Sequence, residues 1–499
     1  MGFSAVPFAR LERRQTLLLL AATCVVEAVL LGVVAVHRGI DADEGFYLMA
    51  GWRVLAGHAL YADFFYPQMP YLPYIHAAVL ALTGPSLVAG RLVGVVTGAL
   101  LAGVLAVVAA RATGRVRVGI AIAGLYAANA LVISIVSTAK TYGVANLALV
   151  GAFLLLAAPK ARVWCTLIAG LSAGLAVGIR LPAAAAVMVL FVWSIRGGIR
   201  NALVFAAGVA IALLPCLWIA LGDPKNFWFC NFEFHALRRE ITGDRAILLQ
   251  KAVVLAKWTL LPQNLVAWAL ALAGLRLQPR AAIPAIACAL ALGLAYLMAT
   301  PTYLQYLTQI VPFLLLAGIP ALAVLLERRN WAIVVAGVYG IGLLLAMRTP
   351  PEGAVRGQKV QFWRLDAVQA VAAYLQQHTQ ADDQVLSWWE GYPFLARRPG
   401  FVGVGFWESN VAKKLPADAR RRHHVLNQED VRQLIAGEEP RLIVFPDGTW
   451  EHLDNTINDH YRQVARFGST RVFGRRDSAA PHAGSAGDLR DTSSRDARG

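Results

Sequence analysis

The sequence predicts an α-helical polytopic membrane protein with a smaller soluble α/β domain at its C-terminal end. Of its 499 residues, 58% are hydrophobic and only 15% are charged, and the mean hydropathy is +0.54. A soluble protein of this length needs more charge to cover its surface. The apolar residues also form long runs, such as 17–36 and 86–110, which suffice to cross a hydrocarbon core of about 30 Å.

Apolar runs separated by charged loops predict about eleven membrane spans within residues 1–349. The first run follows Arg10, Arg13 and Arg14 as a signal peptide would, but its length and the lack of a small-residue cleavage site indicate a retained span. The predicted spans are 16–37, 86–110, 118–136, 141–158, 163–179, 182–195, 201–221, 256–274, 281–299, 304–326 and 331–348.

Lysine and arginine gather in every second loop, which predicts a cytoplasmic N-terminus. The net charge of +16 therefore reflects membrane topology and does not indicate a nucleic-acid partner. An odd number of spans leaves three polar segments outside: loop 38–85, loop 222–255 and everything after about residue 350. The composition, rich in alanine and arginine, suits a bacterial inner (plasma) membrane, where these segments would be periplasmic.

Residues 350–475 have the pattern of a small α/β domain. Amphipathic helices are predicted at 365–378 and 428–436, each followed by a strand, at 384–388 and 441–445, which indicates a βαβ-type unit. Residues 476–499 are rich in serine, glycine, aspartate and arginine without periodicity, and they predict a disordered tail.

Three carboxylates, Asp41, Asp43 and Glu44, stand directly beyond the outer end of the first span. Transfer of a sugar to a hydroxyl group requires a base near the acceptor oxygen, and one carboxylate suffices for an inverting displacement. Asp43 and Glu44 are therefore the candidate catalytic residues. The alternative is a solvated acidic loop with a helix cap. Arg91, at the start of the second span, is expected to pair with an outer-loop acid or a backbone carbonyl.

Aromatic residues and prolines are dense over residues 61–74, as in a segment that lies in the lipid headgroup layer. Tyr66, Gln68 and Tyr71 could bind the sugar or phosphate of a lipid carrier there. An interfacial anchor without a ligand explains the same pattern.

A phosphate leaving group requires fixed positive charge, and Lys140 and Arg180 lie at outer span ends. Snorkelling towards the interface is the alternative for each cation. Tyr303, Gln305 and Tyr306 open a late span and could hydrogen-bond a phosphate or sugar, although an aromatic belt also explains the tyrosines. The five cysteines show no paired spacing, and His423-His424 lacks a third ligand, so no metal site is predicted from these residues.

Several loose motifs follow one another in an order that is typical of one group of enzymes. They are Asp43-Glu44 with Tyr47, Gly57-x-x-x-Tyr61, Pro67-x-x-Pro70-Tyr71, Gly84 with Ala89-Gly90-Arg91-Leu92, residues 137–142, and Tyr303-Leu304-Gln305-Tyr306 before Val311-Pro312-Phe313. In motif order and topology the chain resembles the GT-C superfamily of membrane glycosyltransferases, in its protein O-mannosyltransferase and aminoarabinose transferase-like branch.

The resemblance implies a polyprenyl- or dolichyl-phosphate sugar donor, an inverting transfer and Asp43 as the base. It also implies Tyr47 as a substrate-binding residue and an envelope lipid, glycan or protein as the acceptor. Many members of this group carry a second acid where Lys140 stands. No cofactor is therefore certain, and a divalent metal ion stays an open alternative.

Two other function classes remain open at this stage. A lipid-linked glycan flippase or transporter predicts charged residues near the middle of spans, where this sequence has almost none. A non-catalytic envelope scaffold predicts that Asp43 and Glu44 can be neutralised without loss of function. The gathering of acids, aromatics and cations on one face favours the transferase.

Overall fold

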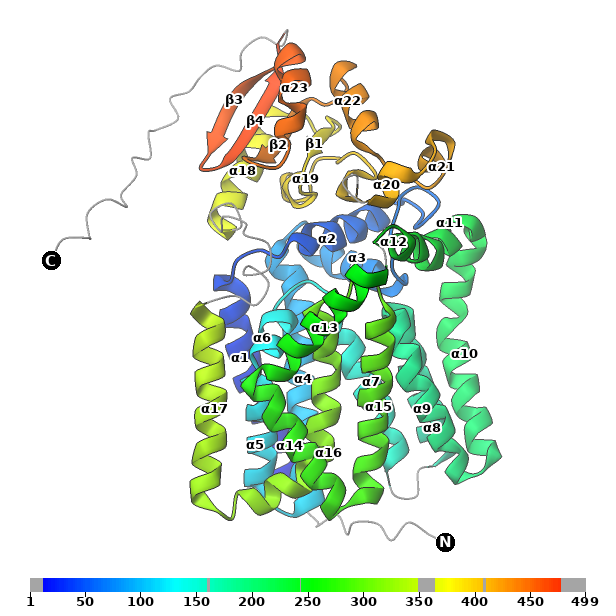
Figure 1. Cartoon of the computed structure of the whole chain (residues 1–499), viewed down its shortest axis with the longest axis vertical. Helices are drawn as coiled ribbons and strands as arrows, with labels where there is room; N and C mark the ends of the chain where they lie inside the picture. Colours follow the sequence, from blue (N-terminus) through cyan, green and yellow to red (C-terminus); the bar gives the residue numbers. More distant parts are fainter. Residues whose placement is uncertain (1–11, 159–161, 243, 349–363, 407–409, 477–499) are drawn as a thin grey trace, which may run out of the picture.

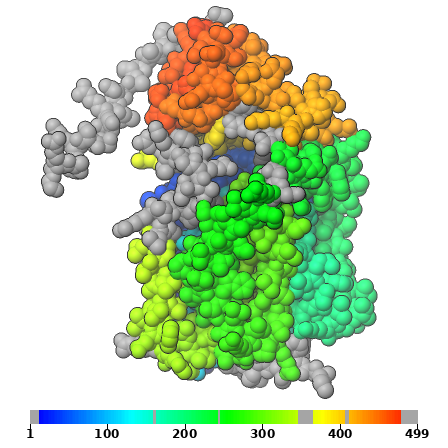
Figure 2. All heavy atoms as spheres, viewed as in Figure 1, coloured from blue at the N-terminus to red at the C-terminus, as the bar shows by residue number. Residues whose placement is uncertain are grey.

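The computed structural model describes residues 12–158, 162–242, 244–348, 364–406 and 410–476. The chain forms three layers (Figure 1): a bundle of long helices, a layer of shorter helices across one end of it, and a small α/β unit above that layer. In the space-filling view the α/β unit stands directly on the helical part (Figure 2).

The bundle contains helices with the length and composition of membrane spans. Among the described residues, five apolar stretches are long enough to cross a bilayer, and two pairs of helices, bent by 69° and 77°, bring the number to as many as seven. The bundle helices are α1 (Arg13–His37), α4 (Leu87–Thr113), α5 (Val116–Ala127), α6 (Ala130–Val136), α7 (Tyr142–Ala157), α8 (Val163–Ile179), α9 (Ala184–Ser194), α10 (Ile199–Gly222), α13 (Asp244–Leu260), α14 (Pro262–Leu277), α15 (Pro279–Met298), α16 (Val311–Leu325) and α17 (Arg329–Arg348).

The predicted multi-pass membrane architecture is confirmed at this level. The eleven predicted ranges fall on the five long stretches, the two bent pairs and four of the shorter apolar helices that the structure describes. Crossing of the bilayer by those four shorter helices stays a prediction. Their apolar parts run for 10–17 residues, which is shorter than each of the five long stretches.

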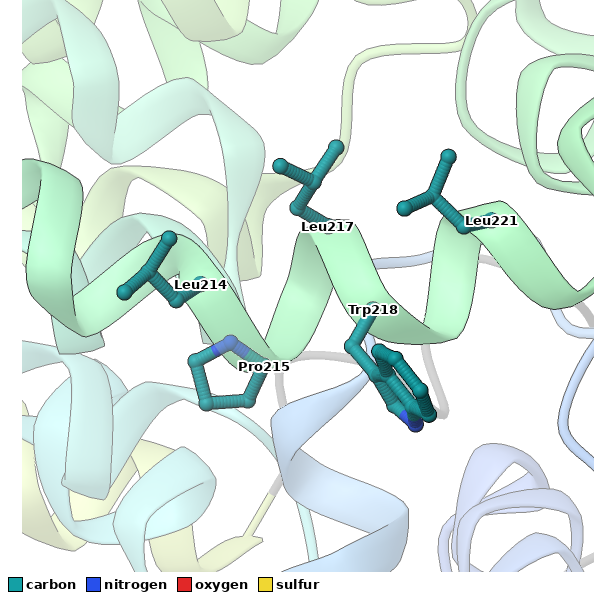
Figure 3. Close-up of a pocket in the computed structure, with 5 residues that line it drawn as sticks. All are labelled: Leu214, Pro215, Leu217, Trp218 and Leu221. Atoms are coloured by element: carbon teal, nitrogen blue, oxygen red, sulfur yellow. The ribbon is translucent and has the colours of Figure 1, made fainter.

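The outward face of the bundle is apolar, as contact with lipid requires. On α10 a shallow hollow is lined by Leu214, Pro215, Leu217, Trp218 and Leu221 (Figure 3). The Trp218 side chain is among the most exposed large apolar groups of the described residues, at 79%. Water would disfavour so large an apolar surface, whereas hydrocarbon chains accept it.

Both bent pairs meet where their helices break. Asn129 caps α6 by accepting hydrogen bonds from the backbone of Leu131 and Val132. From the other break, Gln263 Oε1 accepts a hydrogen bond from Ala130 N at 2.8 Å, and Gln263 Nε2 donates to Ala128 O at 2.6 Å. The amides therefore satisfy backbone groups that a straight helix would have paired internally.

The middle layer consists of α2 (Ala42–Leu55), α3 (Tyr71–Thr83), α11 (Pro224–Trp228) and α12 (Phe234–Thr242). Helix α2 is buried on two sides. Towards the bundle, its Leu48 fills the space that a side chain at Gly90 would need. Towards the α/β unit, a Cβ at Gly45 would lie 2.4 Å from Gly391 N and 2.6 Å from Trp389 Nε1. Only glycine fits such a close approach.

The α/β unit is built on a four-stranded mixed sheet in the order β1-β2-β4-β3. Strands β1 (Val385–Ser387) and β2 (Leu442–Pro446) are parallel, as expected for the predicted βαβ-type unit. Strands β3 (Tyr461–Phe467) and β4 (Thr470–Arg475) form an antiparallel hairpin, which was not predicted from the sequence.

Helices cover the sheet and connect its strands. The predicted helices 365–378 and 428–436 have the bounds of α18 (Leu365–His378) and α22 (Gln428–Ala436). Of the predicted disordered tail, only Arg476 is described, so that prediction lies outside the described residues. The remaining helices are α19 (Gly391–Ala396), α20 (Asn410–Lys414), α21 (Ala417–Arg422) and α23 (Asp454–His460).

Candidate functional site

The first turn of α2 gathers the three carboxylates that follow the first span. Asp41 is the N-cap: its Oδ1 accepts from Asp43 N at 2.9 Å, and its own backbone N donates to Glu44 Oε2 at 2.9 Å. This reciprocal capping box satisfies two backbone donors. Because the N-terminal end of a helix carries partial positive charge, it also favours carboxylates at this place.

Glu44 is fully enclosed between α2, α4 and the segment before α7. Its two oxygens each accept a hydrogen bond of 2.7 Å from Arg91, and Ala139 N donates to Oε1 at 3.0 Å. Arg91 also donates to Ala35 O at 2.5 Å and to Gly39 O at 3.2 Å. The predicted pairing of Arg91 with an outer-loop acid or a carbonyl is therefore confirmed for both kinds of partner.

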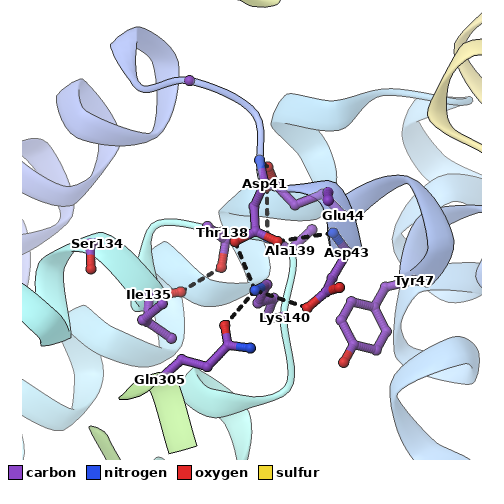
Figure 4. Close-up of polar contacts among 12 residues, drawn as sticks. Asp41, Asp43, Glu44, Tyr47, Ser134, Ile135, Thr138, Ala139, Lys140 and Gln305 are labelled. Atoms are coloured by element: carbon purple, nitrogen blue, oxygen red, sulfur yellow. Dashed lines mark hydrogen bonds and ion pairs between the residues drawn. The ribbon is translucent and has the colours of Figure 1, made fainter. Parts of the chain in front are cut away.

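Lys140 connects the two aspartates at the start of α2 to Gln305, a residue from a distant part of the chain (Figure 4). Its Nζ lies 2.8 Å from Asp41 Oδ2, 3.0 Å from Asp43 Oδ2 and 2.6 Å from Gln305 Oε1. Gln305 belongs to the 3₁₀ helix η4 (Leu304–Ile310) that leads into α16. The Lys140 side chain is only 2% exposed, whereas that of Asp43 is 49% exposed. Asp43 therefore is the acid of this cluster that a substrate could reach.

A tyrosine pair lies beside Asp43. Gln68 Nε2 donates to the Tyr47 hydroxyl at 2.5 Å, and the Tyr66 ring stacks on Phe46 with centroids 5.4 Å apart. Burial raises the pKa of Tyr47, and Asp43 raises it further, whereas Arg180 and Lys140 act in the opposite direction. Burial raises the pKa of Tyr66 as well. Both phenols therefore remain protonated hydrogen-bond donors near neutral pH.

Two polar atoms beside Tyr47 lack hydrogen-bond partners within the described part of the chain. The Tyr66 hydroxyl and Gln68 Oε1 are both buried and unpaired. A buried polar group without a partner costs about 1–3 kcal/mol, so such atoms point to a ligand or water that completes them.

Arg180 is held in a cage of tyrosine rings at the end of α8. Its guanidinium carbon lies 4.3 Å from the ring centroid of Tyr142, 5.2 Å from that of Tyr306 and 5.4 Å from that of Tyr296. It donates to Thr141 Oγ1 at 2.8 Å and to the Tyr296 hydroxyl at 3.2 Å. Over the ranges that the structure describes, no ion pair joins this buried cation to a carboxylate.

The structure brings most of the predicted site residues together, but not all. Tyr303 packs edge-on against Tyr306, with centroids 5.4 Å apart. Tyr71 stands apart from the cluster: its hydroxyl donates to Ala212 O on α10, and its ring occupies the space beside Gly178. Its observed role is to join α3 to α8 and α10.

Three residues that were not predicted as site residues complete the site. Asp41 binds Lys140, and Tyr142 and Tyr296 form part of the cage around Arg180. The Asp-x-x-Glu spacing of Asp41 and Glu44 is a capping-box signature, so it could have assigned both residues. No comparable signal marks Tyr296.

Comparisons with known proteins identify the fold. No protein-family model matches the sequence, and no curated protein matches it either. The chain is similar to the crystal structure of ArnT from Cupriavidus metallidurans bound to undecaprenyl phosphate, with a TM-score of 0.68 and 16% identity over 92% of this chain and 98% of that one. For apo ArnT the TM-score is 0.64, at 17% identity over 91% and 97% of the two chains.

A more distant similarity connects the chain to the oligosaccharyltransferase of Archaeoglobus fulgidus in its apo form. Here the TM-score is 0.48 and the identity 13%, over 88% of this chain and 71% of that one. The match to ArnT spans the bundle, the middle layer and the α/β unit alike, because it covers almost the whole of both chains. The protein therefore has the fold of ArnT, and its predicted structural resemblance to GT-C membrane glycosyltransferases is confirmed.

Proposed function

We propose that the protein is an integral membrane glycosyltransferase that moves a sugar from a polyprenyl-phosphate donor to a hydroxyl group of an envelope lipid, glycan or protein. The observation that carries this proposal is the half-exposed Asp43 carboxylate, which Lys140 holds in place. The buried cation Arg180 accompanies it, and the charges of Asp43 and Arg180 both act on Tyr47. The ArnT fold supports it, since ArnT has been crystallised with undecaprenyl phosphate.

Asp43 serves as the general base in this proposal. Lys140 contacts Asp43 Oδ2, and Oδ1 makes no hydrogen bond or ion pair with any residue in the described ranges. Oδ1 accepts the proton of the acceptor hydroxyl while that oxygen attacks the anomeric carbon of the donor. The bond from this carbon to the phosphate oxygen breaks, the carrier phosphate leaves, and the sugar configuration is inverted.

Arg180 binds the carrier phosphate. A buried cation without a carboxylate partner is costly, and a bound phosphate would offset that cost while stabilising the leaving group. Tyr306, on η4, forms part of the Arg180 cage, and Tyr303 packs against Tyr306. Tyr47, the unpaired Tyr66 hydroxyl and Gln68 supply hydrogen bonds for the sugar.

Glu44 acts as a positioning residue and Lys140 as the group that orients the base. Glu44 has no open face, because Arg91 and the backbone of Asp41 and Ala139 surround its carboxylate. It ties α2 to α4 and to the segment that carries Lys140. Lys140 has three N–H donors, and three oxygens of the protein accept from them, so we assign it to the acids and not to the phosphate.

The proposed setting is a bacterial inner membrane. Residues 1–349 form an eleven-span catalytic domain with a cytoplasmic N-terminus, and residues 350–475 form a periplasmic domain. The alternation of basic loops supports this orientation. It places the first turn of α2 at the periplasmic surface, where lipid-linked sugars and envelope acceptors meet.

The test is a transfer assay with the full-length protein in lipid nanodiscs. A panel of polyprenyl-phosphate sugars and an envelope extract supply donor and acceptor, and release of sugar from the carrier is measured. Asp43→Asn should reduce the rate at least about 100-fold, because a general base contributes that much or more. Asp63→Asn is the matched control, since this exposed aspartate of the same loop makes only local contacts, with Ala59 and His58, among the residues that the structure describes.

The outcomes separate the transferase from the alternatives. Full activity of a folded Asp43→Asn protein would disprove the role of the base. Passage of the intact lipid-linked sugar across a bilayer, without sugar release, would indicate a transporter. A wild-type protein that neither releases nor moves any donor of the panel would favour the scaffold.

A further inference from the structure

The acidic cluster at the start of α2 already contains a cation, which is the ammonium group of Lys140. Three oxygens from two separate segments surround its Nζ at 2.6 to 3.0 Å: Gln305 Oε1 from η4, and Asp41 Oδ2 and Asp43 Oδ2 from the start of α2. Each of the three ammonium donors therefore has a protein oxygen available to accept from it, and the group is buried. Figure 4 shows the three side chains converging on Lys140.

These residues do not fit a divalent metal ion in the same place. Mg²⁺ requires near-octahedral oxygen ligands at about 2.0–2.1 Å, whereas the oxygens here stand at charged hydrogen-bond distances from a nitrogen. Within the described ranges no group of three or more histidine, cysteine, aspartate or glutamate side chains could hold a metal ion. Glu44, which could have been a third carboxylate ligand, is taken by Arg91.

We propose that Lys140 replaces a divalent cation at this site, so that the transfer reaction requires no added metal. Lys140 is a positioning residue: it neutralises charge between Asp41 and Asp43 and directs Asp43 towards the acceptor. The catalytic part of this inference rests on the proposed function, whereas the part concerning metal binding does not.

The protein scaffold holds Lys140 rigidly, as a built-in cation requires. Its neighbour Ala139 donates from the backbone to Glu44 Oε1, and Thr138 Oγ1 donates to Ile135 O at 2.6 Å. Gly90 permits this approach, since a Cβ there would stand 3.2 Å from Ala139 Cβ. The same Arg91–Glu44 pair that stabilises α2 therefore also places the ammonium group.

Removing the ammonium group should turn the cluster into a metal site. In Lys140→Ala, two carboxylates and an amide oxygen would face the space that the side chain leaves, and those are oxygen donors that Mn²⁺ and Mg²⁺ prefer. Lys140→Arg keeps the positive charge and should not create the site. Adding Asp43→Asn to Lys140→Ala removes one ligand and should weaken metal binding.

The first measurement is Mn²⁺ binding by electron paramagnetic resonance, on the full-length protein in nanodiscs after treatment with a chelator. We expect no site dependent on Asp43 in the wild type or in Lys140→Arg, and roughly one additional Mn²⁺ per chain in Lys140→Ala that the double variant loses. Binding of Mn²⁺ by the wild type that disappears in Asp43→Asn would overturn the inference, even if Lys140→Ala failed to fold. Failure of folded Lys140→Ala to gain a site would overturn it as well.

The second measurement is the transfer rate with and without a chelator. Wild-type activity should stay within about twofold in EDTA, and Lys140→Ala should lose at least about tenfold and recover in part with Mn²⁺. If EDTA abolished the activity of the wild type and Mn²⁺ restored it, the proposed role of Lys140 would be refuted, but the proposed transferase function would stand. A wild type inert on every donor would refute the transferase, while the Mn²⁺ titration would still decide on Lys140.

Discussion

Asp43 and Glu44 are neighbours in the chain, yet they meet opposite surroundings. Successive residues of an α-helix point about 100° apart, so one carboxylate faces Lys140 and the other faces Arg91 on α4. Asp43 is half exposed, and Glu44 is enclosed. Of these two adjacent acids, Asp43 is therefore accessible to a substrate, whereas Glu44 holds the structure together.

Breaking the Glu44–Arg91 pair should be among the most destabilising single changes in the middle layer. Glu44→Gln leaves the Arg91 guanidinium buried without its counter-charge, which costs about 3–5 kcal/mol. The exposed pair of Arg115 and Glu327 is the matched control, and Glu327→Gln should cost at most about 1 kcal/mol. Thermal unfolding in nanodiscs measures both, and an equal fall in midpoint would contradict the structural role of Glu44.

Glu390 should make stability depend on pH. Burial raises the pKa of this carboxyl above its usual 4.5, although Arg53, 3.5 Å away, opposes the shift. A raised pKa in the folded state means that the stabilising contribution is complete below pH 4.5 and is lost as pH rises through the folded value. Compared with Glu390→Gln, the wild-type melting temperature should therefore fall between pH 4.5 and 8. A difference that is constant over this range would contradict the expectation.

The chemistry of the site was largely predictable from residue types, but its assembly was not. Asp43, Lys140 and Gln305 were each identified from their place next to a span, where polar residues are costly unless they have a purpose. Their mutual contact depends on segments that are distant along the chain: Lys140 and Gln305 alone are 165 residues apart. Local sequence carries no information about such pairing, and so Lys140 was assigned to phosphate and not to the acids.

The two broken spans show how tertiary contacts determine the shape of an element. The run 118–136 was predicted as a single span because its hydropathy is continuous, but the chain bends by 69° between α5 and α6. Asn129 and the side chain of Gln263 supply the hydrogen bonds at the bend. Hydropathy detects apolar runs, whereas the partner that permits a break lies more than a hundred residues away.

Gln263 should be essential for the stability of both bends. Gln263→Leu leaves Ala130 N and the carbonyls of Ala128 and Tyr339 without their partner in an apolar setting, at about 1–3 kcal/mol for an unsatisfied group. Gln377→Leu, on the exposed face of α18, should change stability by less than about 0.5 kcal/mol. The melting temperatures of the two variants test this expectation. Equal values would show that water reaches the bend and replaces the hydrogen bonds of Gln263.

At the level of the whole molecule, the order of the layers follows from hydropathy, whereas the complete strand pairing of the sheet does not. Long apolar runs placed the bundle, and amphipathic periodicity placed α18 and α22 with their observed bounds. The hairpin of β3 and β4 was not predicted, because apolar and polar residues do not alternate regularly along β3. Arg462, Gln463 and Arg466 interrupt the apolar face that a strand usually shows. Its pairing with β4, and not its own composition, makes it a strand.

The proposed orientation of the molecule in the membrane predicts which of its two sides a reagent can reach from outside the cell. In spheroplasts, a membrane-impermeant maleimide should label Asp382→Cys, which is exposed in the α/β unit, but not Gln278→Cys, exposed between α14 and α15. The parent protein, whose five cysteines are all free thiols, sets the background. Both positions should react after lysis. The opposite labelling pattern would invert the proposed topology.

The convergence of distant segments on Lys140 has a consequence for how the protein is made. During synthesis Asp41 and Asp43 leave the ribosome first, Lys140 follows about a hundred residues later, and Gln305 comes 165 residues after Lys140. Until η4 is inserted, the ammonium group lacks one of its three acceptors. A nascent or truncated chain therefore cannot present the complete cluster, which forms only when insertion of the bundle is nearly finished.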